Sequence, residues 1–192
     1  MFSLQHLNSV AEILQDVSQS LILPRFQNLD DGAVRAKSSI HDLVTDVDEA
    51  AERAITPALN KLFPHAVIVG EESTAADPSL LDRIGGAELA FVLDPIDGTK
   101  NFASGLPLFG VMVAAIERGE VVGAIIHDPV MNDFACALRG EGAWVEHRDG
   151  RRVDLRVAAP VPIKDMNGLV SWAFLPEPER SRATANLPRF AM

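Results

Sequence analysis

The stretch of residues 90–102, AFVLDPIDGTKNF, constrains the fold more than any other part of this sequence. Its apolar, β-prone beginning predicts a buried strand that stops at Asp94, and Pro95 then fixes the next backbone angle. Gly98 lets the backbone approach a ligand closely, and a helix is predicted to start at Thr99. The stretch is therefore predicted to place carboxylates beside a row of backbone N–H donors.

Two acids of this stretch, Asp94 and Asp97, stand three residues apart. Carboxylates suit a hard divalent cation, and free N–H groups at a helix start suit phosphate oxygens. A loop that offers both predicts metal-dependent chemistry on a phosphate ester. The alternatives are a plain Asp-Gly turn and an EF-hand loop. The EF-hand fails, because Ile96 and Gly98 stand where that loop needs oxygen ligands.

A second acidic cluster, Glu71 and Glu72, follows another short apolar run at residues 66–69. If the two predicted strands are neighbours, their ends bring both clusters into one pocket, which is where ligands gather in sheet proteins. Such a pocket repels itself unless cations fill it or some acids stay protonated. For the glutamate pair taken alone, a solvated turn is the simpler interpretation.

Taken together, these elements resemble the inositol monophosphatase family of magnesium-dependent, lithium-sensitive phosphatases. The resemblance is carried by GEES at residues 70–73, DPIDGTKNF at 94–102, and DLVTDVD at 42–48, which is similar to an earlier signature of the family. It covers essentially the whole chain. The family's later Trp-Asp-x-Ala-Ala-Gly-like motif, whose Asp is a metal ligand, has no match here, because Trp172 is followed by Ala173. We therefore expect a family member that lacks the C-terminal segment.

The resemblance implies a magnesium-dependent phosphomonoesterase that hydrolyses a small phosphate ester, most simply one like inositol monophosphate. It implies two or three Mg²⁺ ions held by Glu71, Asp94, Asp97 and the Ile96 carbonyl. Glu71 and Thr99 are expected to activate a water molecule for in-line attack on phosphorus.

Further roles follow from the same resemblance. Asp48 is expected to accept a hydrogen bond from Thr99 and so orient its hydroxyl toward the water. The N–H groups of Gly98 and Thr99 are expected to hold the phosphate oxygens. Lys37 stands where the family has a basic residue facing the active-site loop, although an exposed lysine is the ordinary expectation. The expected substrate-binding residues are Glu71, Ile96, Asp97, Gly98 and Thr99.

Two kinds of alternative remain open. Fructose 1,6-bisphosphate, adenosine 3',5'-bisphosphate and histidinol phosphate are alternative substrates, since relatives that act on them share these motifs. The other class of function is a truncated, catalytically weak member that acts through protein–protein contacts. The missing Trp-Asp motif favours that alternative, whereas the intact acids and Thr99 count against it.

The net charge of −10 argues against nucleic acid as a partner. An acidic protein also repels a phosphate ester, so the expected site needs the local positive charge that bound cations supply. The apolar runs are too short to cross a bilayer, residues 1–10 do not form a secretion signal, and the single Cys136 suits a reducing compartment. We expect a cytoplasmic protein that binds a small phosphorylated metabolite, with no nucleic acid and no membrane as partners.

Helical spacing of apolar residues predicts an amphipathic helix over residues 3–21, capped by Ser3. A second helix is predicted from the capping-box residue Thr45 to Phe63, with Pro57 kinking or splitting it. Its early acids, interpreted only as favourable to the helix dipole, are Asp46, Glu49 and Glu52.

Between the two acidic motifs, residues 73–86 are predicted to form a loop with one short helix at 78–84, and this loop is a candidate lid. Strand-like runs over residues 111–157, separated by turn signals, predict an antiparallel meander. Beyond it the pattern weakens to a predicted strand at 169–175 and a helix at 179–185.

The predicted fold class is α+β, of a layered α/β sugar-phosphatase-like type. An N-terminal helix pair packs on a largely antiparallel β-sheet meander in a phosphatase domain at residues 1–160. Residues 161–192 are expected to begin an incomplete C-terminal α/β subdomain. Because the meander would then lack partners on one face, we expect a homodimer.

Overall fold

The computed structural model describes residues 1–39, 42–162, 165–166 and 175–186. Contacts between residues divide the chain into two units, Met1–Leu155 and Arg156–Met192. The second unit contains the helix α5 (Glu179–Asn186), where the sequence predicted one. The predicted strand at residues 169–175 lies, apart from its last residue, outside the described residues, as does Trp172.

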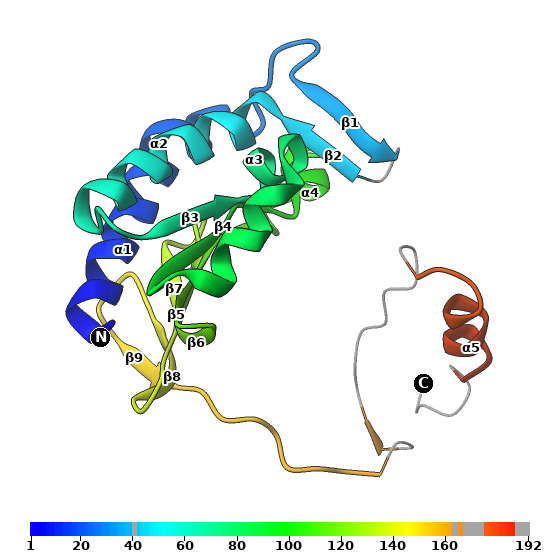
Figure 1. Cartoon of the computed structure of the whole chain (residues 1–192). Helices are drawn as coiled ribbons and strands as arrows, with labels where there is room; N and C mark the ends of the chain where they lie inside the picture. The colour runs from blue at the N-terminus through cyan, green and yellow to red at the C-terminus, as the bar shows by residue number, and fades with distance from the viewer. Residues whose placement is uncertain (40–41, 163–164, 167–174, 187–192) are drawn as a thin grey trace. The chain divides into compact units, whose positions relative to one another are not determined.

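The first helix, α1 (Leu4–Val17), begins at Ser3 as predicted, and the Ser3 side chain accepts the N–H of the third helical residue. Its buried apolar residues belong to the core that α1 shares with the sheet. Figure 1 shows α1 beside α2. The prediction that this α-helix continues to residue 21 is wrong. Val17 is followed by a π-helical turn, η1 (Ser18–Ile22), and then by a 3₁₀ turn, η2 (Leu23–Arg25). Pro24 stands in the first turn of η2, where its missing N–H leaves no helical hydrogen bond unmade.

The second helix, α2 (Asp46–Leu62), starts at the predicted capping box on Thr45. Pro57 lies inside it without splitting it. Because Pro57 has no N–H, the carbonyl of Arg53 four residues earlier loses its helical hydrogen bond. Both residues are exposed, so water can donate a hydrogen bond to that carbonyl instead.

The main sheet has seven strands in sequence order, β3 to β9. β3 runs parallel to β4, and every later neighbouring pair is antiparallel, which confirms the predicted meander. The strands are β3 (Val67–Gly70), β4 (Leu89–Asp97), β5 (Gly110–Glu117), β6 (Glu120–Asp128), β7 (Asp133–Leu138), β8 (Gly142–Glu146) and β9 (Arg152–Asp154).

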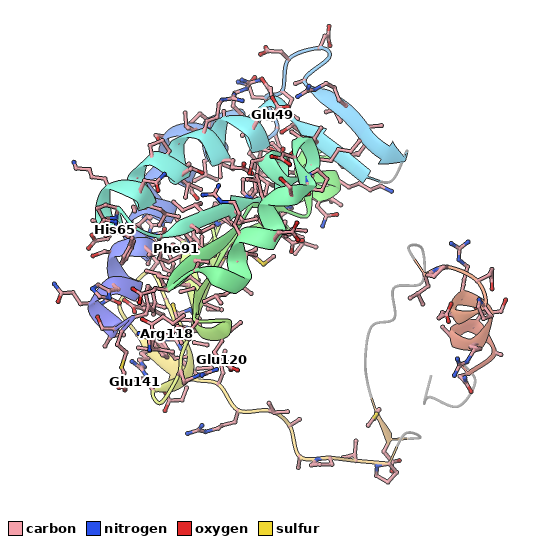
Figure 2. All side chains as sticks on the ribbon, in the orientation of Figure 1. Glu49, His65, Phe91, Arg118, Glu120 and Glu141 are labelled. Carbon is pink, nitrogen blue, oxygen red and sulfur yellow. The ribbon has the colours of Figure 1, made fainter. Side chains whose placement is uncertain are left out.

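The hydrophobic core lies between this sheet and the two helices, which confirms the α+β fold class. Figure 2 shows the side chains around Phe91, which is fully buried on β4. Alternate residues of the strands point to the helices, and each fully buried large apolar side chain stabilises the fold by roughly 1.5–3 kcal/mol. The core residues of the strands include Phe91, Leu93, Val111, Val113, Ile125, Cys136 and Trp144.

Strand β4 continues past Asp94 to Asp97, so the prediction that it stops at Asp94 is wrong. Pairing with β3 ends at Leu93, and the register with β5 is irregular between Asp94 and Asp97. Pro95 falls in this irregular segment, where its missing N–H interrupts no regular ladder.

Residues 71–76 form a helix, α3 (Glu71–Ala76), instead of the predicted turn and loop. A 3₁₀ segment, η3 (Pro78–Gly86), follows where a short helix was expected. A second, two-stranded sheet of β1 (Val34–Ser39) and β2 (Asp42–Thr45) precedes α2. None of the described helices is both long and apolar enough to span a bilayer.

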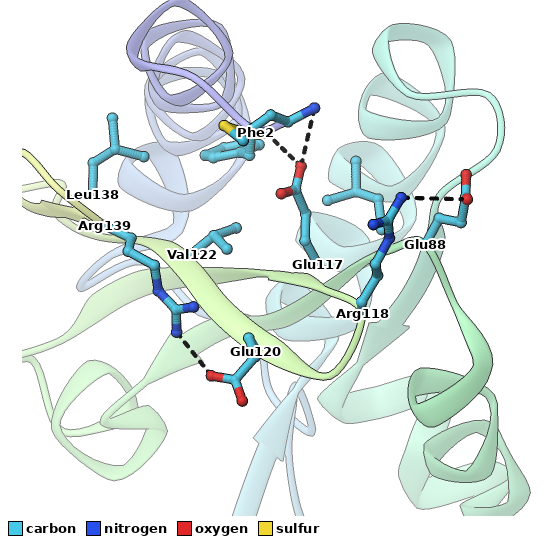
Figure 3. A pocket seen from close by; sticks show the side chains of 10 residues that line it. Phe2, Glu88, Glu117, Arg118, Glu120, Val122, Leu138 and Arg139 are labelled. Atoms are coloured by element: carbon cyan, nitrogen blue, oxygen red, sulfur yellow. Dashed lines mark hydrogen bonds and ion pairs between the residues drawn. The ribbon is translucent and has the colours of Figure 1, made fainter.

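A pocket of about 770 Å³ lies at the start of β4, around the β5–β6 turn (Figure 3). It is at the opposite end of the strand from Asp94 and Asp97. Its charged residues are paired with one another: Arg118 with Glu88 at 3.9 Å, and Arg139 with Glu120 at 2.9 Å. This pocket is therefore separate from the acidic motifs.

His127 generates a prediction about stability. Its ring is fully buried and stacks on Phe134, and burial lowers its pKa. As the pH falls below about 6.5, the unfolded chain takes up a proton that folded His127 resists, so the folded state loses stability. We expect the stability advantage of the wild type over His127→Phe to shrink between pH 7.5 and 5.5, as measured by urea unfolding. A constant difference would contradict the burial of a neutral His127.

Candidate functional site

The two acidic motifs meet at one edge of the sheet. β3 and β4 are parallel neighbours, and Gly70 pairs with Leu93 in their register. The residues that follow this pair, Glu71 and Asp94, are therefore adjacent, and the charge of Glu71 acts directly on the Asp94 carboxyl group. The strand-end arrangement predicted from the sequence is confirmed.

Of the acids in this cluster, Asp94 has the most strongly shifted pKa. Its Oδ1 is buried and has no hydrogen-bond partner among the residues that the structure describes. Burial, followed by the charge and hydrogen bond of Glu71 and then the charge of Asp97, raises the pKa of Asp94 to about 8. The cluster consequently retains a proton near neutral pH when nothing else neutralises it.

Lys37 on β1 faces the same cluster, as the resemblance implied. Its Nζ lies 2.7 Å from Glu71 Oε1 and 2.7 Å from Glu72 Oε1. Burial acts to lower the pKa of Lys37, but the hydrogen bonds and charges of the two glutamates outweigh it and raise that pKa. With 15 % of its side chain exposed, Lys37 is a fixed positive charge at this edge and not an ordinary surface lysine.

The hydroxyl of Thr99 lies 3.0 Å from Asp48 Oδ1 and 2.9 Å from the Ile96 carbonyl oxygen. Its one proton donates to one of these acceptors at a time. Asp48 is 1 % exposed, and its other oxygen accepts the Thr45 N–H at 2.9 Å. Burial raises the pKa of Asp48, against the opposing hydrogen bonds of Thr45 and Thr99. The contact expected between Asp48 and Thr99 is present.

Gly98 joins β4 to the short helix α4 (Thr99–Ala103). Its φ is +89°, and a Cβ added there would lie 2.9 Å from the carbonyl oxygen of Leu108. Both facts require glycine at this position. The first N–H groups of α4 have no partner within the helix, because a helix leaves its first donors unpaired.

The acidic side chains of the cluster are not already arranged as a metal-binding site. In the part of the chain that the structure describes, no three His, Cys, Asp or Glu side chains form a group that could hold a metal ion. Glu71 is bonded to Lys37, and carboxylates that lack a cation repel one another. The donor chemistry nevertheless fits a hard cation, because the unpartnered Asp94 oxygen and its neighbours are carboxylate oxygens.

Glu52 is the important residue that sequence reasoning misread. It is 6 % exposed, and its carboxylate accepts the N–H groups of Glu72 at 2.7 Å and Ser73 at 2.9 Å. The interpretation as an acid that only favours the helix dipole is therefore wrong. A signal was available, because Glu52 lies on the same helix face as Asp48 and Ile55, which are buried.

Comparisons with known proteins agree with this geometry. The family model described as "Inositol monophosphatase family" matches residues 3–184. Nus factor SuhB of Xylella fastidiosa is 38% identical over 147 residues, which is 76% of this chain and 47% of that protein. Inositol monophosphatase of Dictyostelium discoideum is 37% identical over 143 residues, 73% of this chain and 49% of that protein.

The solved structure of an IMPase of Thermotoga maritima superposes with a TM-score of 0.68 at 29% identity, over 84% of this chain and 57% of that one. The chain spans about half the length of the curated relatives that it matches. The matched model covers nearly all of the chain, and the fold agrees with the solved relative. The chain belongs to the inositol monophosphatase family.

Proposed function

We propose that this chain carries the metal-binding residues of a magnesium-dependent phosphomonoesterase that acts on a small ester such as inositol monophosphate. The observation that supports the proposal most directly is the buried, unpartnered oxygen of Asp94 beside Glu71. Buried polar atoms normally have partners, and one that lacks a partner in an acid cluster is a place for a cation.

The residues that would hold Mg²⁺ are Glu71, Asp94, Asp97 and the carbonyl group of Ile96. When bound, the ions would neutralise phosphate charge and lower the pKa of a water molecule, and we expect two or three of them. Lys37 bonds one oxygen of Glu71, so the ammonium group and a cation would compete for the negative charge of one carboxylate.

The chain's own groups would orient the reaction. When Thr99 donates its proton to Asp48, the lone pairs of its hydroxyl are free to accept a hydrogen bond from the attacking water. Glu71 would accept the proton that this water loses. The N–H groups of Gly98 and Thr99 would hold phosphate oxygens, with Ile96 and Asp97 completing the substrate-binding set.

Lys37 would serve as a second source of positive charge. The chain carries a net charge of −10, which repels a phosphate ester at a distance. An ammonium group displaced from Glu71 would stay near the acid cluster, because Lys37 also bonds Glu72 at 2.7 Å. It could then face the anionic ester.

The second candidate function is a role in protein–protein contacts, and two observations favour it. Several relatives are named Nus factor SuhB, not phosphatase. The sheet face away from α1 and α2 also carries exposed apolar side chains, including Val121 and Ile126. A homodimer through this face, a cytoplasmic location, and the division of the chain near residue 160 likewise remain proposals.

One prediction from the proposed function concerns turnover. We expect Asp97→Asn to lower magnesium-dependent phosphate release by about 100-fold or more, because it removes one oxygen charge from the proposed cation site. Folding should be spared, since Asp97 is exposed. The test measures phosphate released from inositol monophosphate, fructose 1,6-bisphosphate, adenosine 3',5'-bisphosphate and histidinol phosphate, with and without Mg²⁺, alongside a melting curve.

The control is Asp149→Asn, an equal change of charge on a turn of the meander. Wild-type turnover in Asp97→Asn would contradict the assignment of the site. Release of phosphate from none of these esters by the unaltered chain would favour the protein-contact function.

Another prediction from the proposed function concerns Lys37. Lys37→Gln removes the charge that faces Glu71 and Glu72, so we expect the metal-free protein to lose about 1–3 kcal/mol of stability. Because a cation no longer competes with the ammonium group, Mg²⁺ should raise the melting temperature more in this variant than in the wild type. Arg35→Gln, on the same strand, is the control. Equal magnesium-induced shifts in all three proteins would refute the competition.

A further inference from the structure

Glu52 is a buried acid that has no role in the proposed reaction. Its two carboxylate oxygens accept backbone N–H groups of α3, Oε2 from Glu72 at 2.7 Å and Oε1 from Ser73 at 2.9 Å. The described part of the chain shows no ion pair for Glu52. The carboxylate is thus committed to the backbone of a segment about 20 residues later in the sequence.

These two bonds fix the first turn of α3. The first N–H groups of a helix have no partner inside it, and a negative charge at this end also interacts favourably with the helix dipole. Ser73 adds a second tie, because its hydroxyl lies 3.2 Å from both the N–H and the carbonyl oxygen of Gly70. Glu71, the proposed cation ligand, is held between these contacts as the first residue of the helix.

Gly70 shows how closely Glu52 is fitted into this turn. Its φ of −96° is open to any residue, so backbone conformation does not require glycine here. A Cβ added at Gly70 would instead lie 2.2 Å from the Glu52 carboxyl carbon. The glycine is therefore needed to make room for the carboxylate, and the two residues are matched to each other.

We propose that Glu52 is a positioning residue, which holds the first turn of α3 so that the Glu71 carboxylate stays beside Asp94. The proposal rests on the proposed function in one respect, that Glu71 is a cation ligand. It adds a determinant of cation affinity that lies on α2 and touches neither the cation nor the substrate.

The test measures the affinity of the full chain for Mn²⁺, a probe that suits the same oxygen ligands and can be followed by electron paramagnetic resonance. We expect Glu52→Gln to weaken Mn²⁺ binding by about 10-fold and Glu52→Ala by more, because the amide keeps only one acceptor oxygen. Hydrogen exchange at the amides of Glu72 and Ser73 should become faster in both variants, with Mn²⁺ absent.

Two controls separate positioning from simple loss of stability. Glu49→Gln removes the same charge from another position on α2 (Figure 2). There Glu49 forms ion pairs with Arg35 and Arg53. Leu59→Ala destabilises the buried face of α2 about two helical turns beyond Glu52. Both should bind Mn²⁺ as the wild type does, even where the melting temperature of Leu59→Ala falls as far as that of Glu52→Gln.

A double variant tests the match between Glu52 and Gly70. Gly70→Ala alone should weaken Mn²⁺ binding, because the new methyl group displaces the Glu52 carboxylate. In Glu52→Ala the space is vacant, so adding Gly70→Ala should cause no further loss. Losses that multiply in the double variant would overturn the proposed coupling.

The outcomes also distinguish this proposal from the proposed function. If the wild type binds Mn²⁺ and Glu52→Gln binds it equally well, the positioning role fails while the cation site stands. If the wild type binds no Mn²⁺, the cation site fails, and exchange at Glu72 and Ser73 alone decides whether Glu52 holds α3. Unchanged exchange in Glu52→Ala would refute that hold.

Discussion

Repulsion among the carboxylates at the shared end of β3 and β4 is the constraint on which the rest of this structure depends. Parallel pairing of the two strands brings Glu71 beside Asp94, and Asp97 adds a third charge to the same field. Like charges this close disfavour ionisation most strongly at Asp94, which is the most buried of the three. The ammonium group of Lys37 offsets the charge of Glu71. A pKa of about 8 lets Asp94 keep a proton near neutral pH, which removes a second negative charge. A divalent cation would relieve the repulsion more completely.

Helix α2 is the element that fixes the site. Its first turn carries Asp48, which holds the Thr99 hydroxyl, and its second carries Glu52, which holds the start of α3. Both acids are buried on the stripe that packs on the sheet, so the core that stabilises the fold also sets their positions. Hydrophobic packing of α2 thus acts on the chemistry through two side-chain carboxylates, each satisfied by hydrogen bonds.

Local patterns predicted most of the fold and the residues of the central motif. Nearby residues determine the Thr45 capping box and the turn between β5 and β6, so local signals predicted both. The convergence of the two acidic motifs followed from predicting two neighbouring strands that each end in carboxylates. Glu52 was misread because no nearby residue marks its partners, the N–H groups of Glu72 and Ser73, which tertiary packing brings to it. The position of Lys37 was implied by the family resemblance and not by a local pattern. The extension of β4 through Pro95 was missed because no sequence signal marks the irregular pairing with β5. A proline is tolerated at such an irregular position of a strand.

The most direct test of the account is a crystal structure of the chain soaked in Mn²⁺, with anomalous scattering to locate the ion. We predict a peak about 2.0–2.4 Å from carboxylate oxygens of Glu71, Asp94 and Asp97, with Lys37 Nζ moved away from Glu71. An unoccupied cluster in which Lys37 still binds Glu71 at saturating Mn²⁺ would contradict the claim that cations replace the ammonium group at this edge of the sheet.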